Sequence, residues 1–489
     1  MSTTYLSSIL IWLPIAAAIA VALLPLSKYA TGSIAVLVSL VEVGFWIQQA
    51  SNFDFHNSSL QMSEQHRWFG DLNITYHVGV YGFSVWLVGL TVIGMAACVG
   101  YGFWVGRDRS RAYFALMLLL TGATVGVFES QDLVLFYAFF EAMLIPLYIL
   151  IGVWGGARRM EATVKFVIYT MTGSLLMLAA IVAYGLHEHS FDLVTGPTST
   201  SRWLFLGFMV AFAIKSPLVP FHGWLPDTYR EAPAEVAAVL SGVIAKAGLY
   251  GMLRIAIPLF HEPTSFYRTA ILSLAAATLV YGSLLAFRAP DFRGVVLYSS
   301  LAQSGLIVLG LFAGSSLGRD GAVLQMVAHG LVSISLFLLA GIVERRTSTG
   351  EFRLLGGMAR GRPVLATLLM SLGVISLAVP GSANFAGEFL ILSGVFQRAW
   401  WWAVIGAGAI VLAAMYMLRL ISAVLHEARG STVGDEAMDV RPAELALVAP
   451  LVAGLLLLSA WPTAISGHSF VGPWPKPPTT RTDYPGAPK

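Results

Sequence analysis

Apolar runs of about 20 residues recur from one end of the chain to the other, separated by short polar connections. A helix of that length crosses the roughly 30 Å hydrocarbon layer of a bilayer, so each run indicates a membrane-spanning helix. The pattern predicts an all-α polytopic membrane protein with about 14 transmembrane helices. The predicted spans lie near residues 5–25, 32–49, 80–104, 112–128, 131–153, 163–185, 202–222, 234–259, 270–288, 294–313, 320–343, 363–395, 400–425 and 443–461.

Two of these spans are interrupted in a similar way. Pro217 and Pro220 fall inside AFAIKSPLVPFHGWLPD, and Pro380-Gly381 falls inside SLAVPGSANFAGEFLIL. A proline removes a backbone donor and clashes with the preceding turn, so each interruption predicts a discontinuous helix. Paired breaks are typical of inverted-repeat transporters, whose ion path passes them. We therefore predict two inverted five-helix repeats at residues 112–259 and 270–425, preceded by helices 1–3 with an outside loop (1–111) and followed by the last helix and a flexible tail (426–489).

Composition narrows the class of protein further. Hydrophobic residues make up 57% of the chain and charged residues 11%, whereas about 25% is usual for a soluble domain. The net charge of +3 is spread in small clusters, so nucleic-acid binding is not indicated. Cys98 is the sole cysteine, which excludes a disulfide or an iron–sulfur cluster held by this chain alone. No phosphate-binding or dinucleotide motif occurs either, so we expect any driving redox chemistry to take place in other chains.

Basic residues are concentrated in the connections that follow the third, fifth and eleventh predicted spans. These are odd-numbered connections, and the positive-inside rule places them in the cytoplasm. Both termini are then predicted outside, and the run from Tyr5 to Leu24 reads as the first span because it lacks the flanks of a cleavable signal. The long polar connection Gln48–Gly79 is expected to cap the outer face, and Val471–Lys489 is expected to be a flexible tail. The basic residues concerned are Arg107, Arg109, Arg111, Arg158, Arg159, Arg345, Arg346, Arg353, Arg360 and Arg362.

Four charged side chains fall within or beside the predicted spans: Glu141, Lys215, Lys246 and Glu388. A charge near the bilayer centre costs about 2.5–3.5 kcal/mol on insertion scales, so its presence needs a reason. One reading is a set of structural ion pairs that fix helix packing. The other is a proton relay, which the presence of two acids and two lysines favours. Burial lowers the proton affinity of a lysine, whereas a nearby carboxylate raises it. On that reading Glu141 and Lys215 titrate as one coupled pair.

His329 is open to two readings, a hydrogen-bonded core residue or a relay member that passes protons between Lys246 and Glu388. A histidine suits the second role because its imidazole titrates near pH 6.5, close to neutrality. Lys165 is expected to extend its side chain to the cytoplasmic surface. Residues at span ends, where charges cost little, are expected to line a mouth or cap a loop: Asp132, Asp227 and Arg230.

Five segments closely resemble the M subunits of bacterial complex I, the NADH-quinone oxidoreductase. They are FFEAMLIPLYILIGVWGG, AFAIKSPLVPFHGWLPDTYREAP, SGVIAKAGLYGMLRI, MVAHGLVSISLFLLAGIVERR and NFAGEFLIL, in this order and spacing. The resemblance covers nearly the whole chain. Glu388, within a GEF motif, separates the M type from the L and N types and from multi-subunit sodium/proton antiporters, which usually have lysine there.

The resemblance implies an antiporter-like fold of fourteen helices with one proton path, in which Glu141, Lys215, Lys246, His329 and Glu388 form a polar central axis. It also implies L-type and N-type partner subunits, the bacterial inner membrane, and NADH, FMN, iron–sulfur clusters and quinone held by partners, with no cofactor in this chain. The alternative is a subunit of a multi-subunit cation/proton antiporter. A solute permease and a purely structural scaffold are further readings, which the intramembrane charges disfavour.

Three positions depart from the family pattern. Tyr81-Gly82 replaces an Asp-Gly pair, Arg293 replaces a lysine, and Gln303 replaces a histidine that many members carry in the tenth helix. A glutamine can order water but carries no proton at neutral pH. The link between the two halves is therefore expected to rely on water, Lys246 and His329 alone.

Overall fold

The computed structural model of the chain describes residues 5–434 and 438–470, so the predicted tail Val471–Lys489 lies outside the described residues. Within them, twelve helical segments are long and apolar enough to cross a membrane. They are α1 (Leu6–Leu23), α2 (Lys28–Asn52), α3 (Gly82–Val105), α4 (Ser110–Glu129), α5 with α6 (Leu133–Ala142 and Leu144–Trp154), α7 (Arg159–Glu188), α10 to α12 (Ala234–Leu259), α13 (His261–Arg288), α14 (Phe292–Phe312), α15 (Ser316–Thr347), α18 with a terminal π turn (Trp400–His426) and α19 (Pro442–Ala460).

The two predicted spans that are not among these twelve are the interrupted ones. α8 (Arg202–Lys215) ends at the first proline pair, and a short helix α9 (Leu225–Glu231) follows the break. α16 (Pro363–Ser376) is separated from α17 (Ala383–Arg398) by a turn in which Gly381 has φ +96°, a conformation that favours glycine. Both predicted breaks are thus confirmed, whereas the count of fourteen spans and the inverted repeats stay predictions.

The connection between α2 and α3 differs from the all-helical prediction. It forms an antiparallel hairpin of β1 (Gln61–Phe69) and β2 (Ile74–Val80), joined through the turn Gly70–Leu72 and Asn73, whose φ is 55°. In β1 only Glu64 is buried. The strand therefore has no apolar face that its sequence pattern could reveal, and it is held by pairing with β2.

Two further irregularities were not predicted, and both lie beside charged residues. The helix that carries Glu141 is divided at Met143 into α5 and α6. Pro146 explains the division, because its nitrogen cannot donate to the Ala142 carbonyl one turn earlier. The helix that carries Lys246 contains two π-helical turns, Leu240–Ile244 and Met252–Ala256, one on each side of the lysine. Such turns are frequent at functional sites.

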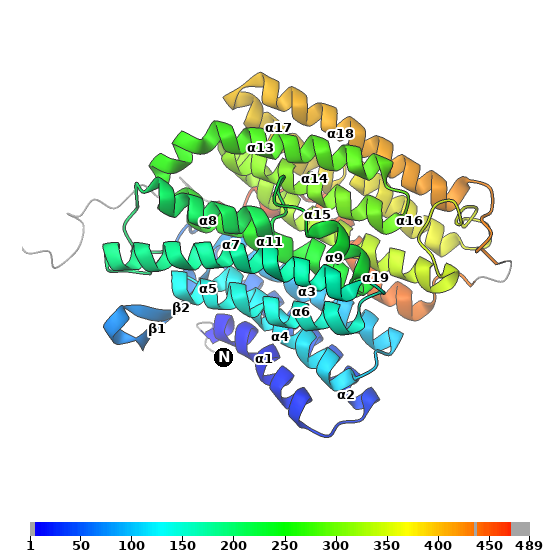
Figure 1. The fold of residues 1–489 in the computed structure, drawn as a ribbon, viewed down its shortest axis with the longest axis horizontal. Coiled ribbons are helices and arrows are strands. Elements are labelled where there is room, and N and C mark those ends of the chain that lie inside the picture. Colours follow the sequence, from blue (N-terminus) through cyan, green and yellow to red (C-terminus); the bar gives the residue numbers. More distant parts are fainter. Residues whose placement is uncertain (1–4, 435–437, 471–489) are drawn as a thin grey trace, which may run out of the picture.

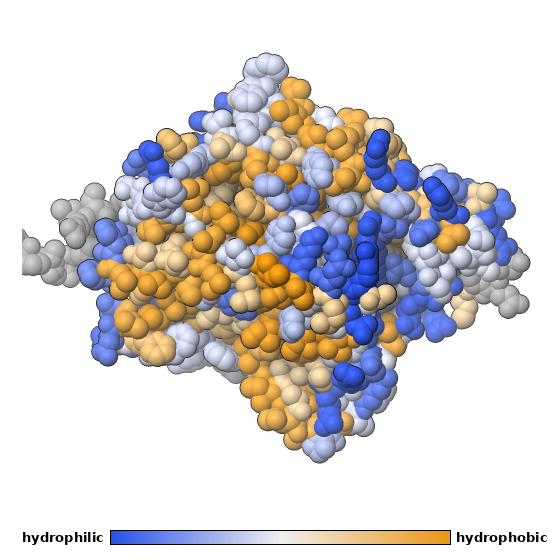
Figure 2. Space-filling view, in the orientation of Figure 1, coloured by the Kyte–Doolittle hydropathy of each residue, from blue (hydrophilic) through white to orange (hydrophobic). Residues whose placement is uncertain are grey.

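In Figure 1 most of the long helices run side by side along one common direction, with the hairpin at one end of the bundle. The most apolar windows of α10 to α12 and of α15 are entirely buried, whereas 39% or less of those of α1, α2 and α19 is buried. Apolar side chains cover much of the face in Figure 2, and polar ones gather toward the end opposite the hairpin. The small helix α20 (Thr463–Ser466) lies against α15.

Three arginine–glutamate pairs tie the helices together at the end opposite the hairpin. Arg107 and Glu235 lie 2.7 Å apart, and both Arg293–Glu344 and Arg346–Glu444 lie 2.6 Å apart. Each arginine donates two hydrogen bonds to its carboxylate, a geometry that adds orientation as well as attraction. Arg293 also donates to the Ala232 carbonyl at 2.7 Å, so this departure from the family pattern anchors the start of α10.

Candidate proton pathway

Lys215 is the last residue of α8 and lies at the first helix break with only 3% of its surface exposed. Its ammonium nitrogen is 4.7 Å from the centroid of the Phe140 ring. Because Phe140 directly precedes Glu141 in α5, the two predicted relay residues are neighbours and interact electrostatically. No ion pair joins their side chains. The predicted pair is therefore placed for coupling across a gap and not by direct contact.

Lys246 is 2% exposed and donates a hydrogen bond of 2.8 Å to the Ser241 carbonyl, one π turn earlier. The Ser241 hydroxyl lies 2.5 Å from the hydroxyls of both Ser300 and Ser333. These three serines, which we call the serine cluster, come from α10–α12, α14 and α15. All three are buried. A lysine between two π turns thus adjoins a set of hydroxyls that can each donate and accept a proton.

His329 lies on the other side of the serine cluster. Its Nε2 atom is 3.3 Å from the Ser300 hydroxyl, and the residue is 3% exposed. The cluster therefore lies between His329 and Lys246, which donates to the Ser241 carbonyl and not to a serine hydroxyl. This arrangement agrees with either reading of the histidine, since a core residue and a relay member would both be hydrogen-bonded.

Glu388, on α17 after the second break, is 2% exposed. Its Oε1 atom accepts from the Gln303 amide at 2.9 Å and from the Gln325 amide at 3.5 Å, and Gln325 also donates to Gln303 at 2.9 Å. The expectation that Lys246, His329 and water alone link the two halves stays a prediction, because hydrogen bonds do not show which groups carry a proton. Gln303 contacts the glutamate directly, and the serines adjoin both Lys246 and His329.

The polar residues that the sequence analysis did not single out, Ser300, Gln325 and Ser333, do leave a signal in the sequence. Gln325, His329 and Ser333 occur at every fourth position of α15, and Ser300 and Gln303 are three apart in α14. Positions three or four apart share one helix face. A polar stripe in a long apolar run thus marks an inward face, but no rule of spacing tells which stripes meet.

The charged residues at the span ends have capping and pairing roles. Asp132 accepts from the backbone N–H groups of Val134 and Leu135 at 2.9 and 3.2 Å, which caps α5 as expected. Lys165 lies 2.7 Å from Asp227, and its side chain is 40% exposed, so it reaches the protein surface and is paired there. Arg230 lies 3.1 Å from Asp291. A cavity of about 330 Å³ lies among these connections, lined by residues that include Arg107, Arg230, Arg293, Arg345, Glu231 and Glu344.

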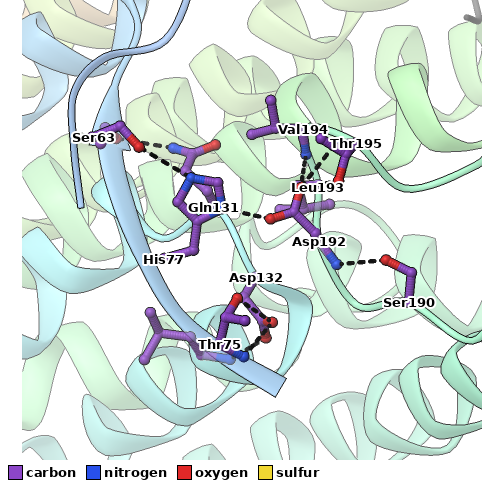
Figure 3. Close-up of polar contacts among 12 residues, drawn as sticks. Ser63, Thr75, His77, Gln131, Asp132, Ser190, Asp192, Leu193, Val194 and Thr195 are labelled. Atoms are coloured by element: carbon purple, nitrogen blue, oxygen red, sulfur yellow. Dashed lines mark hydrogen bonds and ion pairs between the residues drawn. The ribbon is translucent and has the colours of Figure 1, made fainter. Parts of the chain in front are cut away.

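At the hairpin end a second polar network joins three parts of the chain (Figure 3). His77 on β2 lies 2.5 Å from Asp192, in the connection after α7, and 3.1 Å from the Ser63 hydroxyl on β1. Burial alone would raise the pKa of Asp192, but the His77 hydrogen bond and the N–H groups of Thr195 and Val194 hold it below its usual value. This network fixes the hairpin to the ends of the membrane helices.

The comparisons with known proteins agree with this geometry. Residues 130–413 match the family described as NADH:quinone oxidoreductase/Mrp antiporter, transmembrane. The chain belongs to this family. Subunit M of NADH-quinone oxidoreductase from Rickettsia prowazekii is 35% identical over 84% of this chain and 86% of its own length. The subunit M of Rhodobacter capsulatus is 34% identical over 96% of this chain and 95% of its own length.

Among solved structures, a chain of respiratory complex I from Thermus thermophilus has a TM-score of 0.86 and 30% identity, covering 96% of this chain and 100% of its own length. A chain of the Mrp complex from Dietzia has a TM-score of 0.82 at 18% identity, covering 95% of this chain and 52% of its own length, and therefore shows a shared fold alone. The resemblance to the M subunits of complex I is confirmed, and with it the class of antiporter-like, proton-translocating membrane subunits.

Proposed function

We propose that this M-type family member moves a proton outward when quinone is reduced in partner subunits of an NADH-quinone oxidoreductase. Glu141 and Lys215 act as the input pair, Lys246 as the central relay, His329 as a bridge, and Glu388 as the exit-side site. Support comes from the family membership and from the subunit M relatives at about 35% identity.

One observation carries the proposed route: buried polar groups lie beside one another from Lys246 to Glu388. The serine cluster lies between Lys246 and His329, and Gln303 and Gln325 hold Glu388. Polar groups at such depth are costly unless they are partnered, and they mark proton relays in membrane proteins. A mere set of structural ion pairs would not need this sequence of neutral hydroxyls and amides between the charges.

The gap between Glu141 and Lys215 gives the input step a physical basis. In a region of low dielectric constant, the interaction of a carboxylate with an ammonium depends steeply on their separation. A small movement of either helix, each of which is broken beside its charged residue, changes how strongly Glu141 retains a proton on Lys215. We propose that redox-driven movement in the partners acts on this separation.

We further propose that NADH, FMN, the iron–sulfur clusters and quinone are held by partner subunits, and that this chain holds no cofactor. Within the described residues, no group of three or more His, Cys, Asp or Glu side chains could hold a metal ion. L-type and N-type antiporter-like subunits are the proposed neighbours in the bacterial inner membrane, with both termini of this chain outside. The alternative, a subunit of a cation/proton antiporter, is disfavoured because Glu388 stands where those subunits usually have lysine.

The test is the Glu141→Gln variant, which keeps the size of the side chain and removes its charge. Proton pumping and NADH-quinone reductase activity are measured in membranes in which assembly of the complex has been verified. We expect both to fall by about a hundredfold, the lower end of the range for loss of a proton-transfer group. Glu161→Gln, at an exposed position near the start of α7, serves as the control and should keep wild-type activity.

Assembled Glu141→Gln membranes that pump like wild type would show that Glu141 is not a relay member. The proposed axis would then be wrong at its input residue. The next variant to measure would be Lys246→Ala, which removes the hydrogen bond from Lys246 to the Ser241 carbonyl.

A further inference from the structure

Two more carboxyl groups are buried in the helices that precede the relay. Glu42, in the middle of α2, is 1% exposed, and Glu129, at the end of α4, is fully buried. The Gln49 amide donates to Glu129 Oε1 at 2.7 Å and is itself fully buried. Glu42 and Gln49 are seven positions apart and so share one face of α2. Glu42 also interacts electrostatically with Glu129. Together these three residues form what we call the α2–α4 acid site.

Most of the acceptor oxygens in this site lack a partner. Both carboxylate oxygens of Glu42, Oε2 of Glu129 and Oε1 of Gln49 are inaccessible and accept no hydrogen bond. Buried polar atoms in proteins are nearly always hydrogen-bonded, so a set of unsatisfied ones indicates a ligand. Because every one of these atoms is an acceptor, the missing component is a donor or a cation.

No basic side chain is available to supply the positive charge. The basic residues of the same helices, Lys28 and Arg111, are 14 and 18 positions away from Glu42 and Glu129, or about 21 and 27 Å along the helix axes. Neither Glu42 nor Glu129 makes an ion pair with any described residue. Two ionised carboxylates in this setting would repel each other and would also lose their hydration, so at least one should be neutral.

The elements packed around the α2–α4 acid site offer few other ionisable groups. Helix α1 has none, and on the hairpin Glu64 and Tyr76 contact α1, His77 is engaged by Asp192, and His66 and Arg67 are exposed. The remaining ones are Cys98 and Tyr101 on α3, Tyr137 and Glu141 on α5, Tyr148 on α6, and Lys246 and Tyr250 on α11. Lys246 is bonded to the Ser241 carbonyl and Tyr250 to the Phe128 carbonyl at 2.9 Å.

A polar route connects the site to the hairpin. The Ser7 hydroxyl lies beside the Glu129 carboxyl. The next residue, Ser8, donates to the Glu64 carboxylate at 2.9 Å through its hydroxyl, which also lies 2.8 Å from the Tyr76 hydroxyl. Hydroxyl groups can pass a proton because each is both donor and acceptor. No hydrogen bond joins the two serine hydroxyls, but Glu64 on β1 interacts electrostatically with Glu129, so the route ends near a second carboxyl group.

We propose that Glu42, Glu129 and Gln49 form a proton-binding site outside the relay axis, which holds one proton and exchanges it with the hairpin face through Ser7, Ser8 and Glu64. A proton on one of the carboxyl groups supplies one of the missing donors. A metal ion would need several oxygen ligands, and among the described residues no group of three or more His, Cys, Asp or Glu side chains could hold one. The site stands apart from the proposed redox coupling.

The experiment uses the intact complex reconstituted in lipid vesicles. Infrared difference spectra between acid and alkaline buffer, in H₂O and D₂O, are recorded for wild type, Glu42→Gln and Glu129→Gln. We expect a protonated-carboxyl band in wild type that is lost in at least one of the two variants. The band should remain in the Glu262→Gln control, whose side chain is 62% exposed beside Arg202.

Gln49→Leu provides a second test that removes no carboxyl group. Loss of its amide hydrogen bond should shift the frequency of the same band without abolishing it. Redox-driven pumping should persist in the Glu42→Gln variant. The proposal of this site can therefore fail independently of the proposed relay, which is tested by Glu141→Gln.

The proposal is overturned if neither glutamine variant changes the carboxyl band. It is also overturned if the wild-type band is absent and sodium ions alter the carboxylate region, which would identify a cation site.

Discussion

At the scale of single residues, the family's usual histidine in α14 is replaced by an amide that acts differently. Gln303 donates one hydrogen bond to Glu388 and accepts one from Gln325, so it orients the glutamate without titrating. Glu388 Oε2 remains buried and unpartnered. The proton affinity of the exit-side residue therefore depends on neutral donors at one of its oxygens.

Gln303→Leu should reduce coupled pumping about tenfold in assembled membranes. A hydrogen bond to a charged group contributes about 1.5–3 kcal/mol, and a difference of about 1.4 kcal/mol corresponds to a factor of ten. Without Gln303, the single direct donor to Glu388 is Gln325 at 3.5 Å. The measurement is proton pumping per NADH oxidised. Gln303→His restores a donor and should retain most of the activity, whereas wild-type pumping in the leucine variant would show that this bond is dispensable.

At the scale of helices, the irregular segments coincide with the proposed relay. α8 ends at Lys215, α5 ends one residue after Glu141, π turns flank Lys246, and α17 begins five residues before Glu388. A regular helix satisfies its backbone groups internally, whereas a broken one leaves donors and acceptors free for side chains, water or ions. The breaks therefore supply both polarity and room for movement where charges lie in the membrane.

Close approach of α15 and α17 positions Glu388 against the glutamines of α14 and α15. A β-carbon at Gly321 would lie 2.7 Å from the Ile391 nitrogen and 2.9 Å from the Gly387 carbonyl oxygen, and backbone atoms cannot move aside as a side chain can. Gly321→Ala should therefore force the helices apart and lower the free energy of unfolding by about 1–3 kcal/mol. The expected readout is a lower thermal unfolding temperature of the complex, together with reduced pumping.

Gly408→Ala is the matched control, because nothing lies within 4 Å of the added β-carbon in α18. A helical alanine in place of glycine is otherwise neutral or mildly stabilising. If both alanine variants unfold at the wild-type temperature, the α15–α17 contact is looser than the structure indicates.

At the scale of the whole molecule, charge is distributed unequally between the two ends of the bundle. The arginine–glutamate pairs and the arginine-lined cavity lie at the end opposite the hairpin. From the positive-inside rule we propose that this end faces the cytoplasm. On that proposal the hairpin, with Glu64 on β1, faces the outside, the side to which the proposed relay delivers protons.

Orientation can be tested with single cysteines, since Cys98 is buried and is the sole native cysteine. In a Cys98→Ala background, Thr198→Cys in the connection before α8 should react with a membrane-impermeant maleimide from outside. Ser348→Cys, just after α15, should react from inside, and both positions are exposed. Labelling is compared in right-side-out and inverted vesicles, and the reverse pattern would contradict the predicted topology and the direction of the relay.

The sequence by itself determined the membrane class, the places of the helix breaks and the charged residues that needed explaining. These are local properties, because each depends on residues that are neighbours in the chain. They are the length of an apolar run, the missing N–H group of a proline and the free-energy cost of a charge within a span. By the same argument Glu42, inside the predicted span 32–49, and Glu129, just after 112–128, were open to detection, but they were not singled out. The hairpin was not detectable in this way, because β1 buries too little to show a pattern.

Tertiary structure alone decided which polar groups meet. Gln49 and Glu129 are 80 positions apart, Gln303 and Glu388 are 85 apart, and Ser241 and Ser333 are 92 apart. A stripe on one helix shows that a face is turned inward, but its partners depend on how several helices are rotated and packed against each other. That arrangement is a property of the whole bundle, and it brings together polar groups that the sequence shows only one at a time.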